Sequence, residues 1–403
     1  MPSLWPLCPK KIQKKAMKKH QKHTALTRPG FGTFNRQEWT ILGTNCGNIQ
    51  KLSSAIIETL SPKYNLGYVD ADHKSVDENT ESTIENALNK GAGLEYIDKI
   101  DFHRFDTKND FNEFQYREWF NEQDAVLING NHFKGKSQIV VIDQKKKESL
   151  YRKLDRLTNV QLFLFAEGET EVYDFLKTHI ENWENLPTLN LSQEKEIANW
   201  IEVQIHANIA PLNGLVLAGG KSQRMGKDKA TLDYHGIPQT AYATNLLNGF
   251  CKEVYLSCRE DQVDHFQNYK VIKDTFTGLG PFGAILSAFR ENPNAAWLVM
   301  AVDLPLADEA FLKELIANRN ISKNATAFLN PATGFPDPLI TIWEPRSYAT
   351  LLQYLAQGYS CPRKTLINSN IELIETTQAD KLKNVNSPEE FSEVQALLKN
   401  YKK

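Results

Sequence analysis

The chain has 403 residues, of which 41% are hydrophobic, 10% aromatic and 24% charged. At about 150 residues per domain this length predicts two or three domains, and the composition excludes a disordered, a collagen-like and a disulfide-dense protein. A net charge of −2 provides no overall basic field, so neither nucleic acid nor a membrane is expected as a partner. Apolar runs of about 18 residues, which a bilayer span needs, are absent from the sequence. The five cysteines are widely spaced without a Cys-x-x-Cys pair, which predicts reduced thiols and a cytoplasmic protein.

A basic run, KKIQKKAMKKHQK, extends from Lys10 to Lys22. The apolar core of about 7–15 residues that a signal peptide requires does not follow it. We expect a solvated tail. A contact with polyphosphate or nucleic acid is the alternative, and it is disfavoured because no aromatic side chains are interleaved with the lysines to stack on bases.

An alternation of short apolar runs and helix-like stretches begins at Trp39. The runs are β-branched and barely alternate with polar residues, which is typical of strands covered on both faces, and the helices between them indicate a parallel sheet with crossover connections. A helix is predicted after the first run, because Leu52, Ala55, Ile56 and Leu60 share one face. The predicted strands are residues 39–43, 66–70, 124–129, 138–143, 160–165 and 187–191.

A break near residue 210 separates two α/β halves. Residues 192–205 are predicted to form a last helix with Ser192 as its N-cap, and residues 206–214 are a plausible linker. A new strand is expected to begin at Leu215, where the alternation restarts. The expected fold class is therefore α/β with two α/β domains, and the parts are residues 1–28 (basic tail), 29–208 (first domain) and 209–403 (second domain).

The second half contains a glycine-rich segment, GLVLAGGKSQRMGKDKATLDYHG, over residues 214–236. A strand runs into Ala218-Gly219-Gly220, and adjacent glycines let backbone N–H groups approach a ligand with no Cβ in the way. Cationic side chains in the same loop suit a polyphosphate, although a solvated turn is the alternative. The segment fits neither the Walker A pattern nor Gly-x-Gly-x-x-Gly. The cations are Lys221, Arg224, Lys227 and Lys229.

This segment carries a family resemblance. LAGGKSQRMGKDK is similar to the LAGGxSxRMGxxK signature of nucleotidyltransferases with a GT-A-like Rossmann-type fold, and molybdenum cofactor guanylyltransferase is the family it resembles most. Residues 271–289 (VIKDTFTGLGPFGAILSAF), 297–306 (WLVMAVDLPL) and 383–391 (KNVNSPEEF) resemble later motifs of that family in the same order. The resemblance therefore implies a Rossmann-like, GT-A-like nucleotidyltransferase domain over residues 212–391.

The resemblance implies that GMP moves from GTP to molybdopterin or the molybdenum cofactor, with Mg²⁺ as cofactor and release of pyrophosphate. Asp303 follows an apolar strand, where open α/β sheets bind ligands, and a hard carboxylate there suits Mg²⁺; a helix N-cap ahead of Pro305 is the alternative. Arg224 and Lys229 would neutralise charge on the triphosphate and on the leaving pyrophosphate. The candidate catalytic residues are Arg224, Lys229 and Asp303, and Asp303 is the candidate metal ligand.

Base recognition follows from the same resemblance. The carboxylate of Asp274, or backbone groups of the Gly280-Pro281 turn, can accept both N1–H and N2–H of guanine; a cap of the turn is the alternative for Asp274. Ser257 stands where many relatives have Asn, and LAGG in place of the LAAG of related cytidylyltransferases favours guanine over cytosine. The predicted nucleotide-binding residues are Leu217, Ala218, Gly219, Gly220, Lys229, Ser257, Asp274, Gly280, Pro281 and Asp303.

Other polar residues have two interpretations of similar weight. Lys221 and Lys227 either contact phosphate or face solvent, and Asn386 is either close to the metal or an ordinary turn residue. Three residues after the strand-like segment 335–343 either contact the phosphate of the acceptor or begin an exposed helix: Tyr359, Arg363 and Lys364.

The first half places a glycine-containing loop, GTNCGN, between a strand and a helix, which is the position of a P-loop. The required Lys-Ser/Thr is missing, since Asn48 and Ile49 follow Gly47. The context resembles the small P-loop accessory protein of molybdopterin-guanine dinucleotide biosynthesis, in a degenerate form that lacks NTPase activity. We interpret five residues as polar loop residues or isolated side chains, with metal-ligand chemistry as the alternative: Asp70, Asp72, His73, His103 and Cys46.

Two further functional hypotheses remain open. One is a transferase that uses another NTP with a sugar- or polyol-phosphate acceptor. The other is a non-catalytic molybdopterin-binding or chaperone protein. The set Arg224, Lys229 and Asp303 favours catalysis. The implied partners are GTP, molybdopterin or the molybdenum cofactor, and a molybdoenzyme or cofactor-delivery protein.

Overall fold

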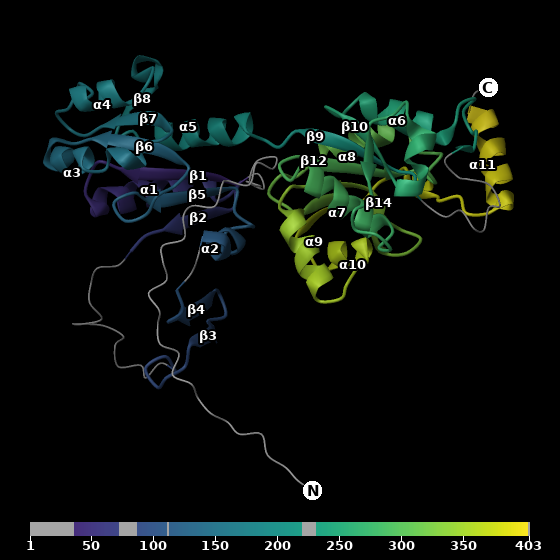
Figure 1. The fold of residues 1–403 in the computed structure, drawn as a ribbon, viewed down its shortest axis with the longest axis horizontal. Coiled ribbons are helices and arrows are strands. Elements are labelled where there is room, and N and C mark those ends of the chain that lie inside the picture. Colours follow the sequence, from purple (N-terminus) through teal and green to yellow (C-terminus); the bar gives the residue numbers. More distant parts are fainter. Residues whose placement is uncertain (1–35, 72–86, 111–112, 220–230, 402–403) are drawn as a thin grey trace, which may run out of the picture. The chain divides into compact units, whose positions relative to one another are not determined.

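Two β-sheets organise the described residues, which are 36–71, 87–110, 113–219 and 231–401 of this computed structural model (Figure 1). The signature residues 220–230 lie outside this range, as does the whole basic tail. Every described residue belongs to a single unit, Gly32–Lys403. Among the described helices, none is long and apolar enough to cross a membrane.

The first sheet has six strands in the order β2-β5-β1-β6-β7-β8, and every pairing in it is parallel. The strands predicted in this half are therefore confirmed, as is the parallel sheet. Short β-branched runs such as AVLIN are buried along their whole length because helices cover both faces of the sheet. The strands are β1 (Gln37–Leu42), β2 (Leu66–Val69), β5 (Ala125–Asn129), β6 (Ser137–Ile142), β7 (Val160–Phe165) and β8 (Thr188–Asn190).

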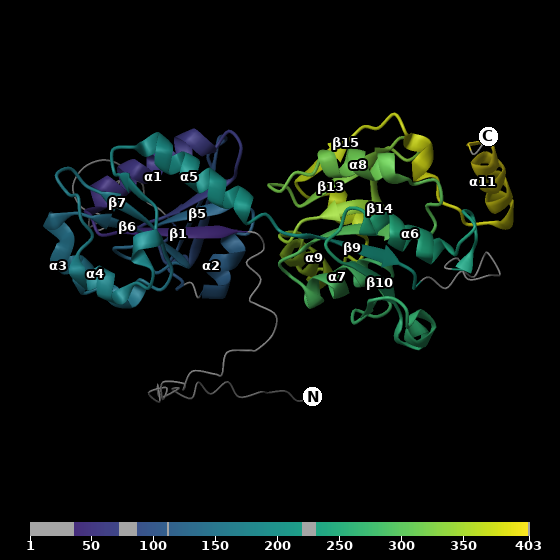
Figure 2. The ribbon, with the colours of Figure 1, turned by 90° about the horizontal axis from the view of Figure 1, so that it is seen from above.

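Helices α1 (Cys46–Leu60) and α5 (Glu194–Ala207) cover one face of this sheet, and α3 (Lys147–Tyr151) and α4 (Asp174–His179) cover the other (Figure 2). The apolar stripe of α1 is buried as predicted, except that Ala55 is only half-buried. The predicted N-cap of α5 is wrong. Gln193, not Ser192, is the N-cap residue, and the Gln193 side chain accepts a hydrogen bond from the backbone N–H of Asn190.

A two-stranded antiparallel hairpin, β3 (Leu94–Asp98) and β4 (His103–Thr107), was not predicted. It is followed by α2 (Glu113–Trp119). The segment is polar and carries no extended apolar run, so its pattern resembled a loop. The described residues also form the short 3₁₀ helices η1 (Gln144–Lys146), η2 (Leu154–Arg156), η3 (Trp183–Asn185), η5 (Glu260–Phe266) and η6 (Ala379–Leu382).

The second sheet has seven strands in the order β11-β10-β9-β12-β14-β13-β15. It is parallel from β11 to β12, but β14 runs antiparallel to both of its neighbours, which the alternation of strands and helices does not reveal. The first strand begins at Leu212, before the predicted Leu215. The strands are β9 (Leu212–Leu217), β10 (Val254–Cys258), β11 (Val271–Lys273), β12 (Ala296–Ala301), β13 (Ala325–Asn330), β14 (Phe335–Trp343) and β15 (Ile371–Ile374).

Helices cover both faces of this sheet as well (Figure 2). One apolar cluster joins α6 (Gln239–Asn248) and α8 (Glu309–Ala317) to one face. Another joins α7 (Pro281–Glu291), α9 (Ser347–Ala356) and α10 (Pro362–Ile367) to the opposite face. The chain ends in α11 (Pro388–Tyr401). The boundaries predicted at 28/29 and 208/209 stay predictions.

Candidate functional site

The carboxyl ends of four neighbouring parallel strands, β11, β10, β9 and β12, lie at one edge of the second sheet. From β9 the chain passes through α6 to β10 on one side, and later through α7 to β12 on the other side. The strand order therefore reverses at β9, and open α/β sheets bind ligands in the crevice at such a switch point. Predicted site residues from separate motifs lie in the last residues of these strands or shortly after them: Leu217, Ala218, Gly219, Ser257, Asp274 and Asp303.

The start of the signature loop is fixed by backbone contacts to both neighbouring strands. The N–H of Ala218 donates to the carbonyl of Ser257 (3.0 Å), and the N–H of Val302 donates to the carbonyl of Leu217 (3.5 Å). The guanidinium of Arg259 donates to the carbonyl of Gly219 at 2.6 Å. The loop therefore leaves the sheet in a defined direction. Its remaining predicted residues, Gly220, Lys221, Arg224, Lys227 and Lys229, lie outside the described residues.

Asp274 and Ser257 form a hydrogen-bonded pair beside this loop. The Ser257 hydroxyl donates to Oδ1 of Asp274 at 2.6 Å. A Cβ placed on Gly219 would lie 3.4 Å from Oδ2 of Asp274, so that second oxygen faces the loop glycine. Burial raises the pKa of Asp274, although the hydrogen bond from Ser257 and the charge of Arg259 oppose this shift. Ser257 thus orients a partly desolvated carboxylate toward the start of the signature loop.

The turn after Asp274 is capped by a different residue. The backbone N–H of Thr275 donates to Oγ of Ser287 at 2.9 Å, and Ser287 donates in turn to the carbonyl of Gly283. The Asp274 carboxylate is engaged with Ser257 instead. The alternative role of Asp274 as a turn cap is therefore not supported by these contacts.

Gly280 and Pro281 begin helix α7, with Gly280 as the N-cap and Pro281 in the first turn. Gly280 has φ +55° and ψ −137°, a conformation that is strained for any residue with a Cβ. Gly283, one turn into the helix, lies so close to the carbonyl oxygen of Phe276 that an added Cβ would overlap it. The absence of a Cβ at Gly283 therefore lets the turn at Phe276 pack directly onto the start of α7.

Asp303 follows β12, as predicted, and is half-buried. Asp303 is not the N-cap of the following helix α8. Asp308 is its N-cap and accepts from the N–H of Phe311 at 3.0 Å. The backbone N–H of Val385 donates to the carbonyl of Asp303 at 2.9 Å. This contact brings the NVNSPEE motif to the end of β12.

The same motif contains Asn384, which the sequence analysis did not single out, and the metal-proximal role of Asn386 stays a prediction. Among the described residues, Oδ1 of Asn384 is buried without a hydrogen-bond partner, whereas Asn386 is exposed. The N–H of Asn386 donates to the carboxylate of Glu390 (2.6 Å), which accepts a second hydrogen bond from the N–H of Ser387 (3.1 Å). Asn386 thus begins the capped turn before α11. The buried side-chain amide oxygen of Asn384 is the signal that makes this residue a candidate ligand, and it can be recognised only in the folded chain.

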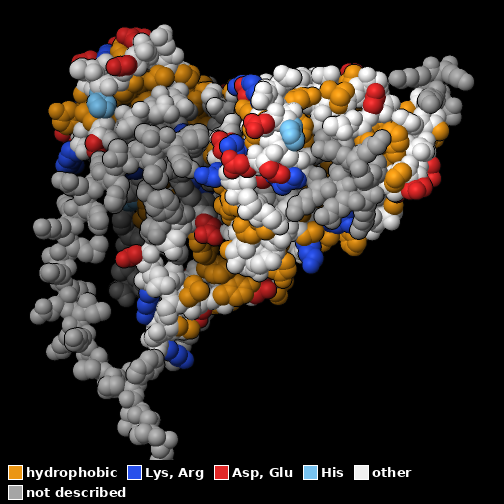
Figure 3. Space-filling model, turned by 45° about the vertical axis from the view of Figure 1, so that its right-hand side comes forward, with side chains coloured by type: hydrophobic (Ala, Val, Ile, Leu, Met, Phe, Trp, Pro, Cys, Tyr) orange, Lys and Arg blue, Asp and Glu red, His pale blue; other side chains and the backbone are white. Residues whose placement is uncertain are grey.

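The rim of this edge carries charges of both signs. Arg259 pairs with Asp261 (3.0 Å) and Lys273 pairs with Glu260 (2.8 Å). Acidic and basic side chains are likewise interspersed on the face of the molecule drawn in Figure 3. Solvent screens exposed pairs of this kind, so they affect the local field more than the stability of the fold.

The corresponding edge of the first sheet is filled by side chains. Asn45, the N-cap of α1, accepts from the N–H of Asn48 at 2.9 Å, and the buried Thr44 hydroxyl donates to Asp143 at 2.7 Å. Lys51 pairs with Glu194 at 3.3 Å. The Asn45 side chain thus accepts a hydrogen bond from a backbone N–H of the kind that a P-loop directs at phosphate, which agrees with a degenerate loop.

Polar side chains surround Cys46 at the start of α1. Its Sγ lies 3.3 Å from Nε2 of His132, and Asn131 donates to it at 3.5 Å. Lys153 donates to Oδ1 of Asn131 at 2.9 Å, and burial, followed by the charge of Arg156, lowers the pKa of Lys153. Cys46 therefore belongs to a hydrogen-bonded network.

Asp70 is also saturated by hydrogen bonds. Its carboxylate accepts from Tyr68 (2.7 Å), Gln50 (3.0 Å) and Asn129 (2.8 Å). Burial alone would raise the pKa of Asp70, but these hydrogen bonds hold it below its usual value. His103 lies in the exposed hairpin, where its Nδ1 is 2.9 Å from the Tyr96 hydroxyl. Within the described part of the chain no group of three or more His, Cys, Asp or Glu side chains is arranged to hold a metal; Asp72 and His73 lie outside that part.

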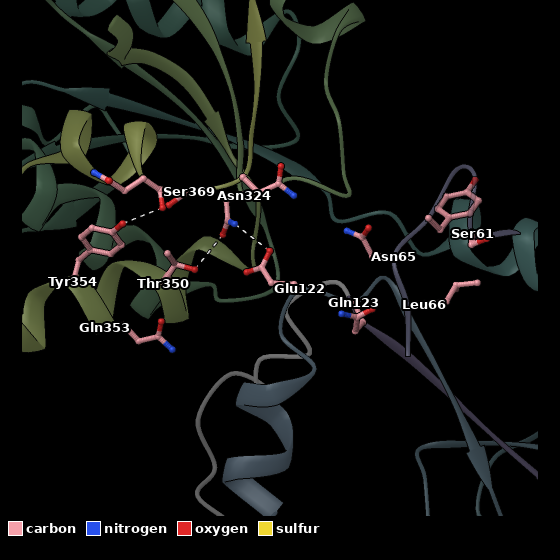
Figure 4. Close-up of a pocket in the computed structure, with 13 residues that line it drawn as sticks. Ser61, Asn65, Leu66, Glu122, Gln123, Asn324, Thr350, Gln353, Tyr354 and Ser369 are labelled. Carbon is pink, nitrogen blue, oxygen red and sulfur yellow. Dashed lines mark hydrogen bonds between the residues drawn. The ribbon is translucent and has the colours of Figure 1, made fainter. Parts of the chain in front are cut away.

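A polar pocket of about 680 Å³ lies elsewhere in the unit and contains none of the predicted site residues (Figure 4). Asn324 lies at its centre, where it donates to Glu122 at 3.1 Å and accepts from Thr350 at 3.1 Å. The predicted acceptor residues Tyr359, Arg363 and Lys364 are not in its lining; the ammonium of Lys364 lies over the Tyr359 ring at 5.9 Å. This pocket and the strand-end site are therefore distinct.

Comparison with known proteins finds relatives of the half of the chain that contains the strand-end site. Residues 214–371 match the MobA-like NTP transferase domain. A probable molybdenum cofactor guanylyltransferase of Opitutus terrae is 33% identical over 156 residues, which are 38% of this chain and 76% of that protein. The chain belongs to the MobA-like NTP transferase family. The resemblance predicted from the four motifs is thereby confirmed.

A second relative extends beyond this chain's match. The molybdenum cofactor biosynthesis bifunctional protein of Synechocystis is 35% identical over 186 residues, which are 46% of this chain and 54% of that protein. The match therefore spans about half the length of this relative. Among solved structures, molybdopterin-guanine dinucleotide biosynthesis protein A from Archaeoglobus fulgidus aligns with 47% of this chain and 99% of its own (TM-score 0.41, 20% identity). Bacillus subtilis MobB aligns with 42% of this chain and 97% of its own (TM-score 0.31, 16% identity).

Proposed function

We propose that the MobA-like half transfers GMP from GTP to molybdopterin or the molybdenum cofactor and releases pyrophosphate. Relatives named molybdenum cofactor guanylyltransferase support this assignment. The observation that carries it is the pair of carboxylates at the switch point: Asp274 and Asp303 follow two strands on opposite sides of β9, from which the signature loop leaves. The Asp274 carboxylate can accept hydrogen bonds from a base, while the Asp303 carboxylate can hold a cation at the phosphates.

In this proposal Asp274 recognises guanine. Oδ1 of Asp274 accepts one hydrogen bond from Ser257 and can accept a second, and Oδ2 is directed at Gly219, where no Cβ fills the space. A carboxylate accepts from both N1–H and N2–H of guanine, whereas adenine and cytosine present a different pattern of donors and acceptors on that edge. The backbone of the Gly280-Pro281 turn lies after the same strand and completes the base site. The site therefore favours GTP over ATP and CTP.

The transfer itself is a substitution at the α-phosphate of GTP. An oxygen of the acceptor's phosphate forms a bond to the α-phosphorus as the bond to the bridging oxygen breaks, and pyrophosphate leaves with that oxygen. Arg224 and Lys229 neutralise charge on the triphosphate and on the leaving group. Catalysis then comes mostly from positioning and charge stabilisation.

Asp303 is the proposed ligand of Mg²⁺. The donors present are hard oxygens, namely the Asp303 carboxylate and the buried, unpartnered Oδ1 of Asn384 in the segment bound to it, and Mg²⁺ prefers one or two such ligands together with substrate phosphates. When bound, the cation would neutralise phosphate charge. Asp303 would hold it, and the contact from Val385 fixes the backbone of Asp303.

We assign the first half a docking or acceptor-delivery role beside the transferase. Its loop after β1 lacks the Lys and Ser/Thr of a P-loop, and the α1 N-terminus is capped by Asn45. A molybdoenzyme or a cofactor-delivery protein is the corresponding partner. A reduced, cytoplasmic setting fits the free thiols of Cys46, Cys251, Cys258 and Cys361.

The test is incubation of the full chain with Mg²⁺, molybdopterin and each NTP in turn, with pyrophosphate release as the readout. GTP should support release and ATP and CTP should not. Asp303→Ala should abolish release while leaving the circular dichroism spectrum unchanged. Preference for another NTP, or turnover with a sugar phosphate in place of molybdopterin, would favour the alternative transferase, and nucleotide binding without turnover would favour a carrier protein.

A further inference from the structure

The loop that carries Asp303 is attached to side chains from a distant part of the sequence. Nε2 of His235 lies 2.9 Å from the carbonyl oxygen of Pro305, and the hydroxyl of Tyr242 donates to the carbonyl oxygen of Ala307 at 2.9 Å. A carbonyl oxygen can only accept, so Nε2 of His235 carries the proton in this contact. The backbone at Pro305 and Ala307, which follows Asp303, is thus held by His235 and Tyr242.

The two rings support each other. The imidazole of His235 stacks on the ring of Tyr242 with 3.7 Å between centroids and 8° between planes. Burial, with the charge of Asp308 adding to it, raises the pKa of Tyr242 to about 12, so its hydroxyl remains a donor at neutral pH. Since Tyr242 is fixed by α6 and by Ala307, the stacking also fixes the direction in which His235 donates.

The same segment continues directly from the signature loop. Leu232 and Tyr234 are buried in one apolar cluster with Leu306 of the Asp303 loop and Val385 of the NVNSPEE motif. His235 follows these residues immediately. Leu232 and Tyr234, which come shortly after the signature in the sequence, are therefore packed against the Asp303 loop, and His235 adds a polar contact to that loop.

We propose that His235 is a positioning residue for the transfer reaction: through Pro305 it sets the place of the Asp303 carboxylate after the end of β12. This inference rests on the proposed function. Its effect reaches the substrate only through Asp303, so the loss of His235 should weaken metal binding at Asp303 and slow turnover. Guanine recognition lies across β9 at Asp274 and should not change.

The test uses the full chain with Mn²⁺ as the probe cation. His235→Phe keeps a ring over Tyr242 and removes the N–H donor, whereas His235→Gln keeps a donor and removes the ring. Mn²⁺ affinity in the presence of GTP is measured by electron paramagnetic resonance, GTP affinity is measured in EDTA, and kcat and KM are measured with Mg²⁺. Tyr242→Phe, which removes only the hydroxyl contact to Ala307, is the milder second variant.

We expect His235→Phe to weaken Mn²⁺ binding and lower kcat by about tenfold or more, because displacement of a reacting group by about 1 Å costs up to a hundredfold in rate. GTP affinity in EDTA and KM for GTP should stay within about twofold of wild type. His235→Gln should recover part of the loss. Wild-type Mn²⁺ affinity in folded His235→Phe, or equal losses in both variants together with weaker GTP binding, would overturn the positioning role.

The outcomes separate this inference from the proposed function. If the wild-type chain transfers no GMP, the function fails, and the Mn²⁺ titration still decides the role of His235. If wild type transfers GMP and His235→Phe does so equally well, only the inference fails. If His235→Phe does not fold, Tyr242→Phe provides the decision: an unchanged Mn²⁺ affinity would contradict a loop held by this pair of rings.

Discussion

Replacing Asp274 with Asn tests how the site distinguishes guanine from other bases. Oδ1 of Asp274 accepts from the Ser257 hydroxyl at 2.6 Å, and Oδ2 faces Gly219. Asparagine has the same shape, but one of its two polar atoms is a donor, so it cannot accept from both N–H groups of guanine. A hydrogen bond to a charged group contributes about 1.5–3 kcal/mol, which predicts a loss of about tenfold to a hundredfold in GTP affinity.

The same substitution should affect stability in the opposite direction. Burial raises the pKa of Asp274 in the folded chain, so its protonated form is favoured on folding. The contribution of such a group to stability is complete below its unfolded pKa and is lost as pH rises through the folded pKa. At neutral pH the wild type therefore carries an unfavourable buried charge that Asp274→Asn lacks. The variant should be more stable than wild type at pH 7, and this difference should shrink as the pH falls toward 4.

The assay combines calorimetric titration with GTP and ATP and urea unfolding at several pH values. Ser257→Ala is the matched control, because it keeps the carboxylate and removes only the hydroxyl that orients it. It should lower GTP affinity less than Asp274→Asn does. An Asp274→Asn protein with wild-type GTP affinity, or one less stable than wild type at pH 7, would refute the reasoning.

Three further outcomes are expected. Gly283→Ala should lower the free energy of unfolding by about 1–3 kcal/mol and should also lower GTP affinity, because the new methyl group overlaps the Phe276 carbonyl. A variant that unfolds at the same urea concentration as wild type would contradict the close packing. Glu344→Ala should cost about 3–5 kcal/mol in the same assay, because it leaves Arg319, now paired at 2.6 Å and only 14% exposed, without its carboxylate, and a smaller loss would mean that Arg319 reaches solvent. Without an acceptor, the full chain should release no phosphate from GTP or ATP, because Asn45 caps the helix that a P-loop would offer to phosphate; Mg²⁺-dependent release would show an active non-standard loop.

Much of the fold was predictable because its signals are local. Strands such as 160–165 and the apolar face of α1 were recognised from runs and periods within a few residues of each other. The LAGG segment was recognised for the same reason, since a strand followed by adjacent glycines and cations is a contiguous pattern. The family assignment followed from such contiguous motifs, and from their order along the chain.

The tertiary structure decided what depends on neighbours in space. The strand order β11-β10-β9-β12 brings Ser257 to Asp274 and the NVNSPEE motif to Asp303, and no sequence pattern specifies which strands pair. The cap positions were likewise assigned by contacts, because Asp308 begins α8 and Ser287 caps the turn after Asp274, whereas the ligand roles of Asp274 and Asp303 stay predictions. The sequence alone thus determined which chemical groups are present and in what order, since local composition encodes both. Packing determined which of these groups meet, because hydrogen bonding and burial depend on distances that only the folded chain sets.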